Sequence, residues 1–508
     1  MKKIFITILL VGSMIASSCS DYLDILPKDQ QSTDMYWKSQ DDVEAILAEG
    51  YYTMRSLTNT FFDWGELRGA SIATNDVSSQ KIQNFQILPS NAKVAWDKFY
   101  HIIGMANSVL KYAPGVVDED DSYKVEQMKS HQTEAYFMRA FSYFYLVRNF
   151  REVPLITEPY VDDEMSISVA KSSETDIIAL IKNDIKTALE SNAAKETFPA
   201  TSNWKNPTKG RATKWALYAL MADVCLWNED YDECITYADF LINSTANMRP
   251  VFIANSEQWY TLFYPGDSNE SIFEIQFDGT LSGQSSGSPS KLFSTSLSAP
   301  IFYFSDRMTE TLLEEYQNNP RSVRSFYGTY YFLITATDNT QAAIWKYTGM
   351  EGNTARGSNN EDANFIIYRM AEVILMKAEA LICKGGKENW EAAIDLINQI
   401  RQRANVSTID PSLEESNEES LLYDYLLPER NMELAAEGKR WYDLLRFARK
   451  HNFQYKQRFI DLILENNTTG NQKWISSALQ SEDAWYLPIP EDELKNNKLL
   501  VQNPYYGV

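Results

Sequence analysis

The chain has 508 residues and carries 69 acidic against 47 basic side chains, a net charge of −22 at pH 7. A surface this acidic repels nucleic-acid phosphates and anionic lipid headgroups, so nucleic acid and a bare lipid surface are excluded as partners. The length is enough for a large core and for two or three domains of ordinary size.

The first 18 residues predict a lipoprotein signal peptide. Lys2 and Lys3 precede an apolar run over 4–15, and small residues then lead to Cys19. As a helix this run spans about 18 Å, too short for the ~30 Å hydrocarbon core of a membrane. We therefore expect cleavage before Cys19 and lipidation of this cysteine. The alternative is plain secretion, with Cys19 as an ordinary residue.

Most of the remaining pattern is helical. Apolar residues recur at helical spacing, and Ser173 stands where an N-cap is expected for the last of four segments. The predicted helices cover 43–54, 96–107, 124–149 and 177–189.

Two further segments, 216–242 and 373–398, each predict a helical hairpin. They share small residues at matching positions, Ala222 with Ala380 and Cys234 with Ala393. Small residues at these places let two helices approach closely, as in tetratricopeptide repeats. We therefore predict an all-α fold with tetratricopeptide-like repeats.

Residues 250–360 differ in composition from the helical segments and are rich in Gly, Ser, Asn and aromatic residues. Short strands are predicted around 273–277, 325–335 and 342–347. Long aromatic loops on a rigid scaffold are where binding sites are commonly found. We expect this region to be an irregular, ligand-facing insertion.

Two segments near the C-terminus carry a family resemblance. One reads NFIIYRMAEVILMKAEALICKGG and runs on into EAAIDLINQIRQRA, and the other reads LLPERNMELAAEGKRWYDLLRF. Together they resemble the C-terminal half of the SusD/RagB-like nutrient-binding lipoproteins. Looser similarities, in the same order as in the family, occur at 133–156, 210–227 and 299–327. Arg151 departs from the pattern, because the family usually has Gly there.

The resemblance implies a binding protein and not an enzyme. It implies a lipid-anchored protein on the outer face of the outer membrane, whose partner is a SusC-like TonB-dependent transporter and whose ligand is most often an oligosaccharide. The sequence contains no P-loop, no G-x-G-x-x-G, no H-E-x-x-H and no EF-hand motif, so we expect no cofactor, and a loop-bound calcium stays open. Together with the residue patterns, the resemblance divides the chain into the signal peptide (1–18), an N-terminal helical region (19–245) and a C-terminal region (246–508), the last with a ligand-facing part (250–360) and a helical repeat (365–450).

Aromatic and polar residues outside the helical stripes are the candidate ligand-binding residues. Tyr and Trp rings offer a flat apolar face to a sugar, and Arg, Asn and Asp side chains hydrogen-bond its hydroxyls. Phe85 stands where family members often place a stacking residue. Trp259, Tyr260 and Tyr264 also fall in the irregular region. The residues selected are Trp64, Arg68, Asn75, Asp76, Phe85, Tyr303, Tyr327, Tyr330 and Trp345.

Two alternatives stay open, a binder of peptides or another non-sugar nutrient on the same scaffold and an α-helical glycoside hydrolase. Hydrolysis needs two carboxylates about 5–10 Å apart, and no pair stands out. Charged residues at 429–440, spaced three and four apart, are expected to form an ion-pair lattice along one helix.

The cysteines beyond the signal peptide are Cys225, Cys234 and Cys383. No Cys-x-x-Cys pair or Cys/His cluster is present, so a zinc site is not expected. We expect Cys225 and Cys234 to be buried thiols instead of a disulfide.

Overall fold

The computed structural model describes residues 36–160, 168–201, 206–279, 287–293, 301–334, 340–357 and 362–507. The predicted signal peptide and the lipidation site at Cys19 lie outside these residues. Within them, no helix combines the length and the apolar character that crossing a membrane requires.

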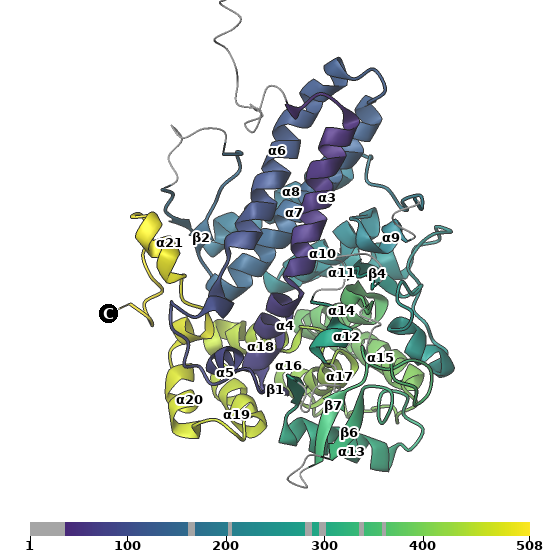
Figure 1. Cartoon of the computed structure of the whole chain (residues 1–508). Helices are drawn as coiled ribbons and strands as arrows, with labels where there is room; N and C mark the ends of the chain where they lie inside the picture. The colour runs from purple at the N-terminus through teal and green to yellow at the C-terminus, as the bar shows by residue number, and fades with distance from the viewer. Residues whose placement is uncertain are drawn as a thin grey trace, which may run out of the picture.

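The N-terminal half is an array of long helices that pack in chain order (Figure 1). The predicted N-cap is confirmed, since the Ser173 side chain accepts a hydrogen bond from the Asp176 backbone N–H. The long helices are α3 (Gln40–Ser56), α6 (Asp97–Glu119), α7 (Val125–Phe150), α8 (Glu174–Glu190), α10 (Lys214–Trp227) and α11 (Tyr231–Ile242).

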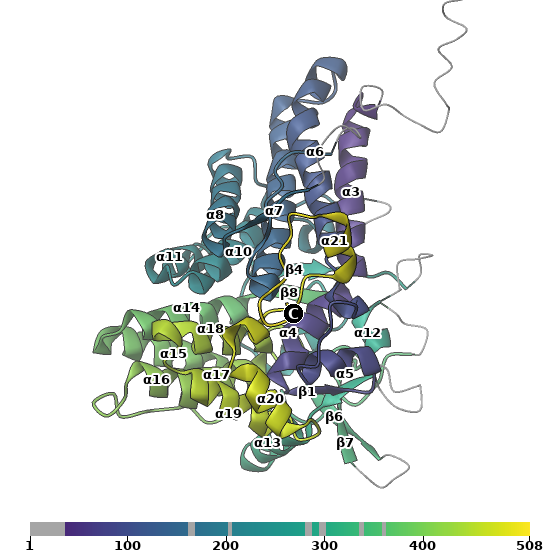
Figure 2. The ribbon, with the colours of Figure 1, turned by 90° about the vertical axis from the view of Figure 1, so that its left-hand side faces the viewer.

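The C-terminal half continues the same packing, because α14 lies against α11 (Figure 2). Both predicted hairpins are confirmed as α10–α11 and α14–α15. The helices of this half are α13 (Asp306–Asn318), α14 (Met370–Lys384), α15 (Lys387–Arg403), α16 (Glu418–Ser420), η4 (Leu421–Leu426), α17 (Leu427–Glu433), α18 (Arg440–Phe453), α19 (Lys456–Asn466), α20 (Gln472–Leu479) and α21 (Glu491–Asn496).

The prediction about the thiols is also confirmed. Cys225 and Cys234 lie on the facing helices α10 and α11, and both are buried and free. Cys383 is free as well, with its side chain partly exposed.

Short elements join the two halves. The strands form two-stranded antiparallel ladders, β1 (Ile72–Thr74) with β5 (Phe302–Phe304), β2 (Val153–Pro154) with β3 (Lys171–Ser172), β4 (Ser271–Ile275) with β8 (Phe365–Arg369), and β6 (Tyr330–Ile334) with β7 (Thr340–Ile344). The short helices are α4 (Thr58–Glu66), η1 (Leu67–Gly69), α5 (Val77–Gln83), η2 (Ala92–Val94), α9 (Pro207–Gly210), η3 (Ser256–Leu262), α12 (Pro289–Leu292) and η5 (Glu482–Trp485). The predicted strands in the irregular region are therefore confirmed as β4, β6 and β7.

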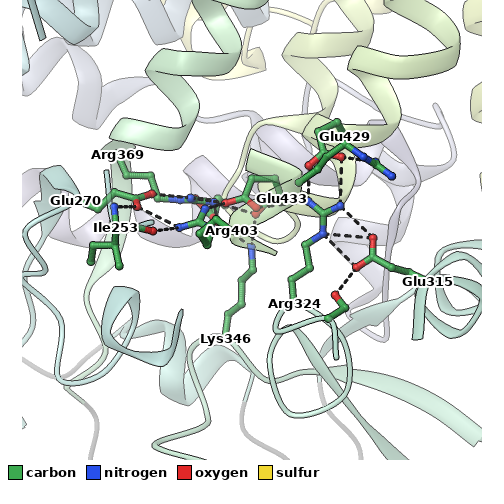
Figure 3. A network of polar contacts seen from close by, with 12 residues as sticks. Ile253, Glu270, Glu315, Arg324, Lys346, Arg369, Arg403, Glu429 and Glu433 are labelled. Carbon is green, nitrogen blue, oxygen red and sulfur yellow. Dashed lines mark hydrogen bonds and ion pairs between the residues drawn. The ribbon is translucent and has the colours of Figure 1, made fainter. Parts of the chain in front are cut away.

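The expected ion-pair lattice along one helix is wrong. Helix α17 ends at Glu433, and the chain then turns through Ala436 and Gly438, which have φ values of 63° and 75°. Glu429, Glu433 and Glu437 are buried and pair with cations from other elements (Figure 3). These cations are Arg324 before β6, Lys346 after β7, Arg369 at the end of β8, and Arg401 and Arg403 at the end of α15.

Glu433 is the centre of this buried ion-pair network. Its carboxylate accepts from Arg369 at 2.7 Å, from Arg324 at 3.5 Å and from Arg403. Glu270, next to β4, pairs with Arg369 and Arg403, each at 3.1 Å. Burial by itself would raise the pKa of Glu433, but the surrounding cations outweigh it and lower this pKa to about 2.

This arrangement predicts acid sensitivity. A carboxylate whose pKa is lowered on folding stabilises the protein above its ordinary pKa of 4.5, and the contribution is lost as the pH falls towards about 2. We expect Glu433→Gln to lower the free energy of unfolding at pH 7 by about 3–5 kcal/mol, because it leaves buried cations without their partner. Its stability should also fall less between pH 5 and pH 2 than that of the wild type, as measured by urea unfolding.

The control for this experiment is Glu414→Gln, which changes a carboxylate with an exposed side chain. It should reproduce the wild-type stability at every pH. Parallel pH profiles for Glu433→Gln and the wild type would contradict the assignment of the acid-sensitive contribution to Glu433.

Arg151, the departure from the family pattern, adopts a backbone conformation that favours glycine. It follows α7 with φ 67° and ψ −53°, and the Glu152 N–H donates to the Phe150 carbonyl at 2.8 Å. This is a γ-turn with positive φ, a strained conformation for a residue with a Cβ atom. The strain explains why Gly is expected at this position.

We predict that Arg151→Gly raises the free energy of unfolding by about 1 kcal/mol, because it removes the Cβ clash. The lost ion pair to Asp483, 3.4 Å long and largely exposed, contributes little. Arg151→Ala is the matched control, since it removes the same ion pair but keeps Cβ, and it should not be stabilised. Equal stabilities for the two variants in denaturant unfolding would refute the strain.

Candidate functional site

Trp64, selected as a ligand-binding residue, belongs to the protein core. Trp64 is fully buried on α4, stacked on Phe99 at 5.2 Å, and its Nε1 donates to the Lys93 carbonyl at 2.8 Å. Gly65 shows how tightly α4 is enclosed, because a Cβ atom there would lie 2.0 Å from the Gly438 carbonyl oxygen. The prediction that Trp64 binds ligand is therefore wrong, because its side chain is buried.

Arg68 is also part of the core. Its guanidinium lies 4.4 Å over the Trp441 ring, and it donates to Asn149 Oδ1 at 2.5 Å and to the Trp485 carbonyl at 2.7 Å. These contacts tie η1 to α7, α18 and η5. The prediction that Arg68 lies at a ligand surface is therefore wrong, because its side chain is buried like that of Trp64.

Three further selected aromatics are covered by protein. Phe85 packs on Trp441 at 5.9 Å and is 2% exposed, Tyr330 is fully buried, and Trp345 is 5% exposed. The Trp345 ring lies edge-on to Tyr327 and Tyr331 at 5.0 and 5.1 Å. These rings have no free face in this structure, so we leave them out of the candidate site.

The remaining selected residues lie in two places. Pairing of β1 with β5 sets Ala73 opposite Tyr303, and the Asn75 N–H donates to the Ile301 carbonyl at 2.8 Å. Asn75 and Asp76 therefore lie close to Tyr303. The Asp76 carboxylate caps α5 by accepting from the Ser79 N–H at 2.8 Å. Tyr327 is 37% exposed and lies beside Trp345. Among the described residues, no strand pairing places it next to Asn75, Asp76 or Tyr303.

A pocket of about 510 Å³ lies between η3 and the turn that follows β7. The turn is closed by hydrogen bonds from the Met350 N–H to the Thr354 carbonyl at 2.7 Å and from the Arg356 N–H to the Thr348 carbonyl at 2.8 Å. The pocket lining includes two partly buried tyrosines and several polar side chains. The pocket is lined by Tyr260, Thr261, Tyr264, Pro265, Met350, Glu351 and Thr354.

The walls of this pocket are held by the rest of the protein. The Arg356 guanidinium lies 4.9 Å over the Tyr264 ring and donates to the Phe263 carbonyl and to Asp362, both at 2.6 Å. Trp259 Nε1 donates to the Gly328 carbonyl at 3.3 Å. These contacts fix both walls of the pocket.

The buried network reaches the same wall. Lys346 and Arg403 lie 5.5 and 4.9 Å from the Trp259 ring, so two of the network cations support the residue next to Tyr260. Figure 3 shows the network joined to Ile253, whose N–H donates to Glu270 at 3.0 Å. The segment leading into η3 is therefore anchored as well.

The chemistry of the pocket suits binding. Two tyrosine rings offer flat apolar faces, and Glu351 and two threonines offer hydrogen bonds. Among the described residues that line the pocket, Glu351 is the one carboxylate. Glycoside hydrolysis needs two carboxylates. The sequence analysis noted Tyr260 and Tyr264 but did not select them. No sequence pattern marked Glu351 and Thr354 as binding residues, because their place in the pocket depends on how two segments distant in sequence meet.

One cluster could gather metal ligands. The donor atoms of Cys225, Asp230 and Glu233 lie within 4.8 Å of one another. Lys182 already binds both carboxylates, Asp230 at 2.7 Å. Burial raises the pKa of the Cys225 thiol to about 12, so this sulfur keeps its proton. The Lys182 ammonium group thus takes the position that a metal ion would have, and the residues present do not fit a metal site.

Comparison with known proteins decides the family. The model of the SusD family matches residues 298–506, and a second model, described as "Starch-binding associating with outer membrane", matches residues 21–226. The chain belongs to the SusD/RagB-like family. The resemblance found in the sequence and the all-α fold are therefore confirmed.

Relatives agree with this assignment over nearly the full length. SusD-like protein P38 of Formosa agariphila is 28% identical over 494 residues, which cover 88% of this chain and 91% of that protein. A SusD superfamily structure from Bacteroides thetaiotaomicron has a TM-score of 0.72 at 22% identity and covers 92% of this chain and 99% of its own. A laminarin-binding SusD-like protein has a TM-score of 0.68 at 21% identity, with coverage of 92% and 99%.

Proposed function

We propose that this protein is a cell-surface lipoprotein that binds oligosaccharides and delivers them to a SusC-like TonB-dependent transporter in the outer membrane. The observation that carries the proposal is a pocket with two tyrosine rings and one carboxylate on a SusD-like fold. The outer-membrane description of the second family model and the laminarin-binding neighbour support it. In this proposal Cys19 carries the lipid anchor.

The proposed mechanism is capture without turnover. Tyr260 and Tyr264 stack on the C–H faces of a sugar, while Glu351, Thr261 and Thr354 bind its hydroxyls. A small open site of this kind binds in the μM–mM range, about 4–8 kcal/mol. Repeated units of a polymer and attachment beside the transporter raise the effective affinity.

The first test removes the stacking rings. Tyr260→Ala combined with Tyr264→Ala should lower the affinity for a recognised glycan at least tenfold, because both stacking faces are lost. Affinity electrophoresis in gels that contain laminarin or soluble starch measures the effect, and circular dichroism checks the fold. Glu351→Ala, which changes an exposed side chain of the same pocket, should also weaken binding.

The control is Tyr52→Ala, which removes a tyrosine that is 52% exposed on α3 and does not line the pocket. Its affinity should equal that of the wild type. Wild-type affinity in both pocket variants would place the sugar elsewhere, and sugar released from the polysaccharide would contradict capture without turnover.

A further inference from the structure

Trp474 is the third residue of α20, and its side chain is partly exposed to solvent. It is 46% exposed, the one tryptophan of the described chain with a large exposed area. Its Nε1 donates to the Phe85 carbonyl at 3.0 Å. The polar edge of the indole is thus satisfied by protein, and the direction of the ring is fixed.

The residue that accepts this hydrogen bond has a strained backbone. Phe85 has φ 54° at the end of α5, a position where glycine is favoured. The Gln86 N–H donates to the Lys81 carbonyl at 2.9 Å and the Phe85 N–H to the Ile82 carbonyl at 3.2 Å, which together form a Schellman motif. A bulky residue in this conformation is strained, and such strain concentrates at functional sites.

Phe85 performs two tasks that a glycine could not combine. Its ring packs on Trp441 in the core, at 5.9 Å, while its carbonyl oxygen faces the exposed indole. The strained turn is therefore clamped to the core by its side chain. The clamp holds the hydrogen-bond acceptor of Trp474 in one place.

The loop before α20 is held just as firmly. Asn467 is buried and donates to the Gln83 carbonyl and to Asn84 Oδ1, both at 3.1 Å. Gly470 donates to Asn467 Oδ1 at 3.0 Å, and a Cβ atom there would lie 2.4 Å from Asn84 Oδ1. These contacts join α20 to the end of α5, and the two helices lie close together in Figures 1 and 2.

We propose that Trp474 is a second sugar-binding platform, separate from the pocket, that stacks on a pyranose ring of an uncharged glycan. The proposal rests on the proposed function and adds a site to it. A rigid exposed ring loses little entropy on binding, so its apolar face is available at low cost. Trp474 does not line the pocket, and no residue of α20 does.

The class of ligand follows from the neighbouring side chains. Gln86, Asn471, Gln472 and Lys473 are exposed and lie close to Phe85 and Trp474 in the chain, and Lys473 is the one charged side chain of this set. The Asn471 amide oxygen accepts from the Trp474 N–H at 3.1 Å. Amides donate to and accept from hydroxyl groups without adding charge. The net charge of −22 disfavours sulfated or carboxylated glycans. An uncharged polysaccharide satisfies both conditions.

Two platforms on one protein predict a dependence on chain length. A polymer that reaches both sites gains effective concentration at the second, whereas a short oligosaccharide occupies one site at a time. Loss of Trp474 should therefore weaken binding of a polymer more than binding of a disaccharide.

The test uses the chain from Cys19 onwards, with laminarin and soluble starch as probes. Variants Trp474→Ala, Trp474→Phe and the pocket double variant Tyr260→Ala/Tyr264→Ala are compared by affinity electrophoresis. We expect Trp474→Ala to weaken polysaccharide binding at least fivefold and Trp474→Phe to retain most of it. The bound polysaccharide should also protect wild-type tryptophan fluorescence from iodide quenching, and this protection should shrink in Trp474→Ala.

Leu499→Ala is the control, because Leu499 is 54% exposed and carries no ring. It should bind as the wild type does. If Trp474→Ala binds with wild-type affinity and the pocket variant binds more weakly, this inference is overturned and the proposed function stands. The exposed ring would then be assigned to a protein contact. A wild-type protein that binds neither polysaccharide counts against both.

Discussion

The burial of Glu433 among arginine side chains is the interaction on which the C-terminal half depends. Taking a carboxylate and three guanidinium groups out of water is costly, and the cost is offset only when every charge has its partner at hydrogen-bond distance. The partners come from α15, β8 and the segment before β6 (Figure 3). A shift of any of these segments would leave a buried charge unpaired, so the network specifies their relative positions.

The candidate binding surface is built on this network. Lys346 and Arg403 support Trp259, and Trp259 bonds to the turn before β6, so the irregular region is tied to the helices beneath it. Aromatic residues there serve two different purposes. Trp259 and Trp345 fill the interior and anchor the loops, whereas Tyr260 and Tyr264 face the pocket. Pocket walls held in this way suit a binding protein, because little order has to be gained when the ligand arrives.

Local patterns predicted the helices well, but they did not show which of the selected binding residues are buried. Helical spacing is a property of neighbouring residues, so the long helices and both hairpins could be read directly. The glycine expected at 151 was also informative, because φ is a local property and Arg151 does adopt a positive value. The spacing of the charged residues at 429–440 predicted ion pairs between Glu and Arg along one helix. This prediction failed because α17 ends at Glu433 and the partners of the glutamates are distant in sequence.

The sequence by itself determined the all-α fold, the SusD/RagB-like family and the free state of the buried thiols. Only the tertiary structure decided which aromatic rings face solvent. Trp64 and Trp474 both lie in short helices with polar neighbours, and no local signal separates them. Packing against Phe99 and the close approach of Gly438 to Gly65 bury the first, while the second keeps 46% of its surface exposed. Burial depends on segments that are distant in sequence, and periodicity carries no information about them.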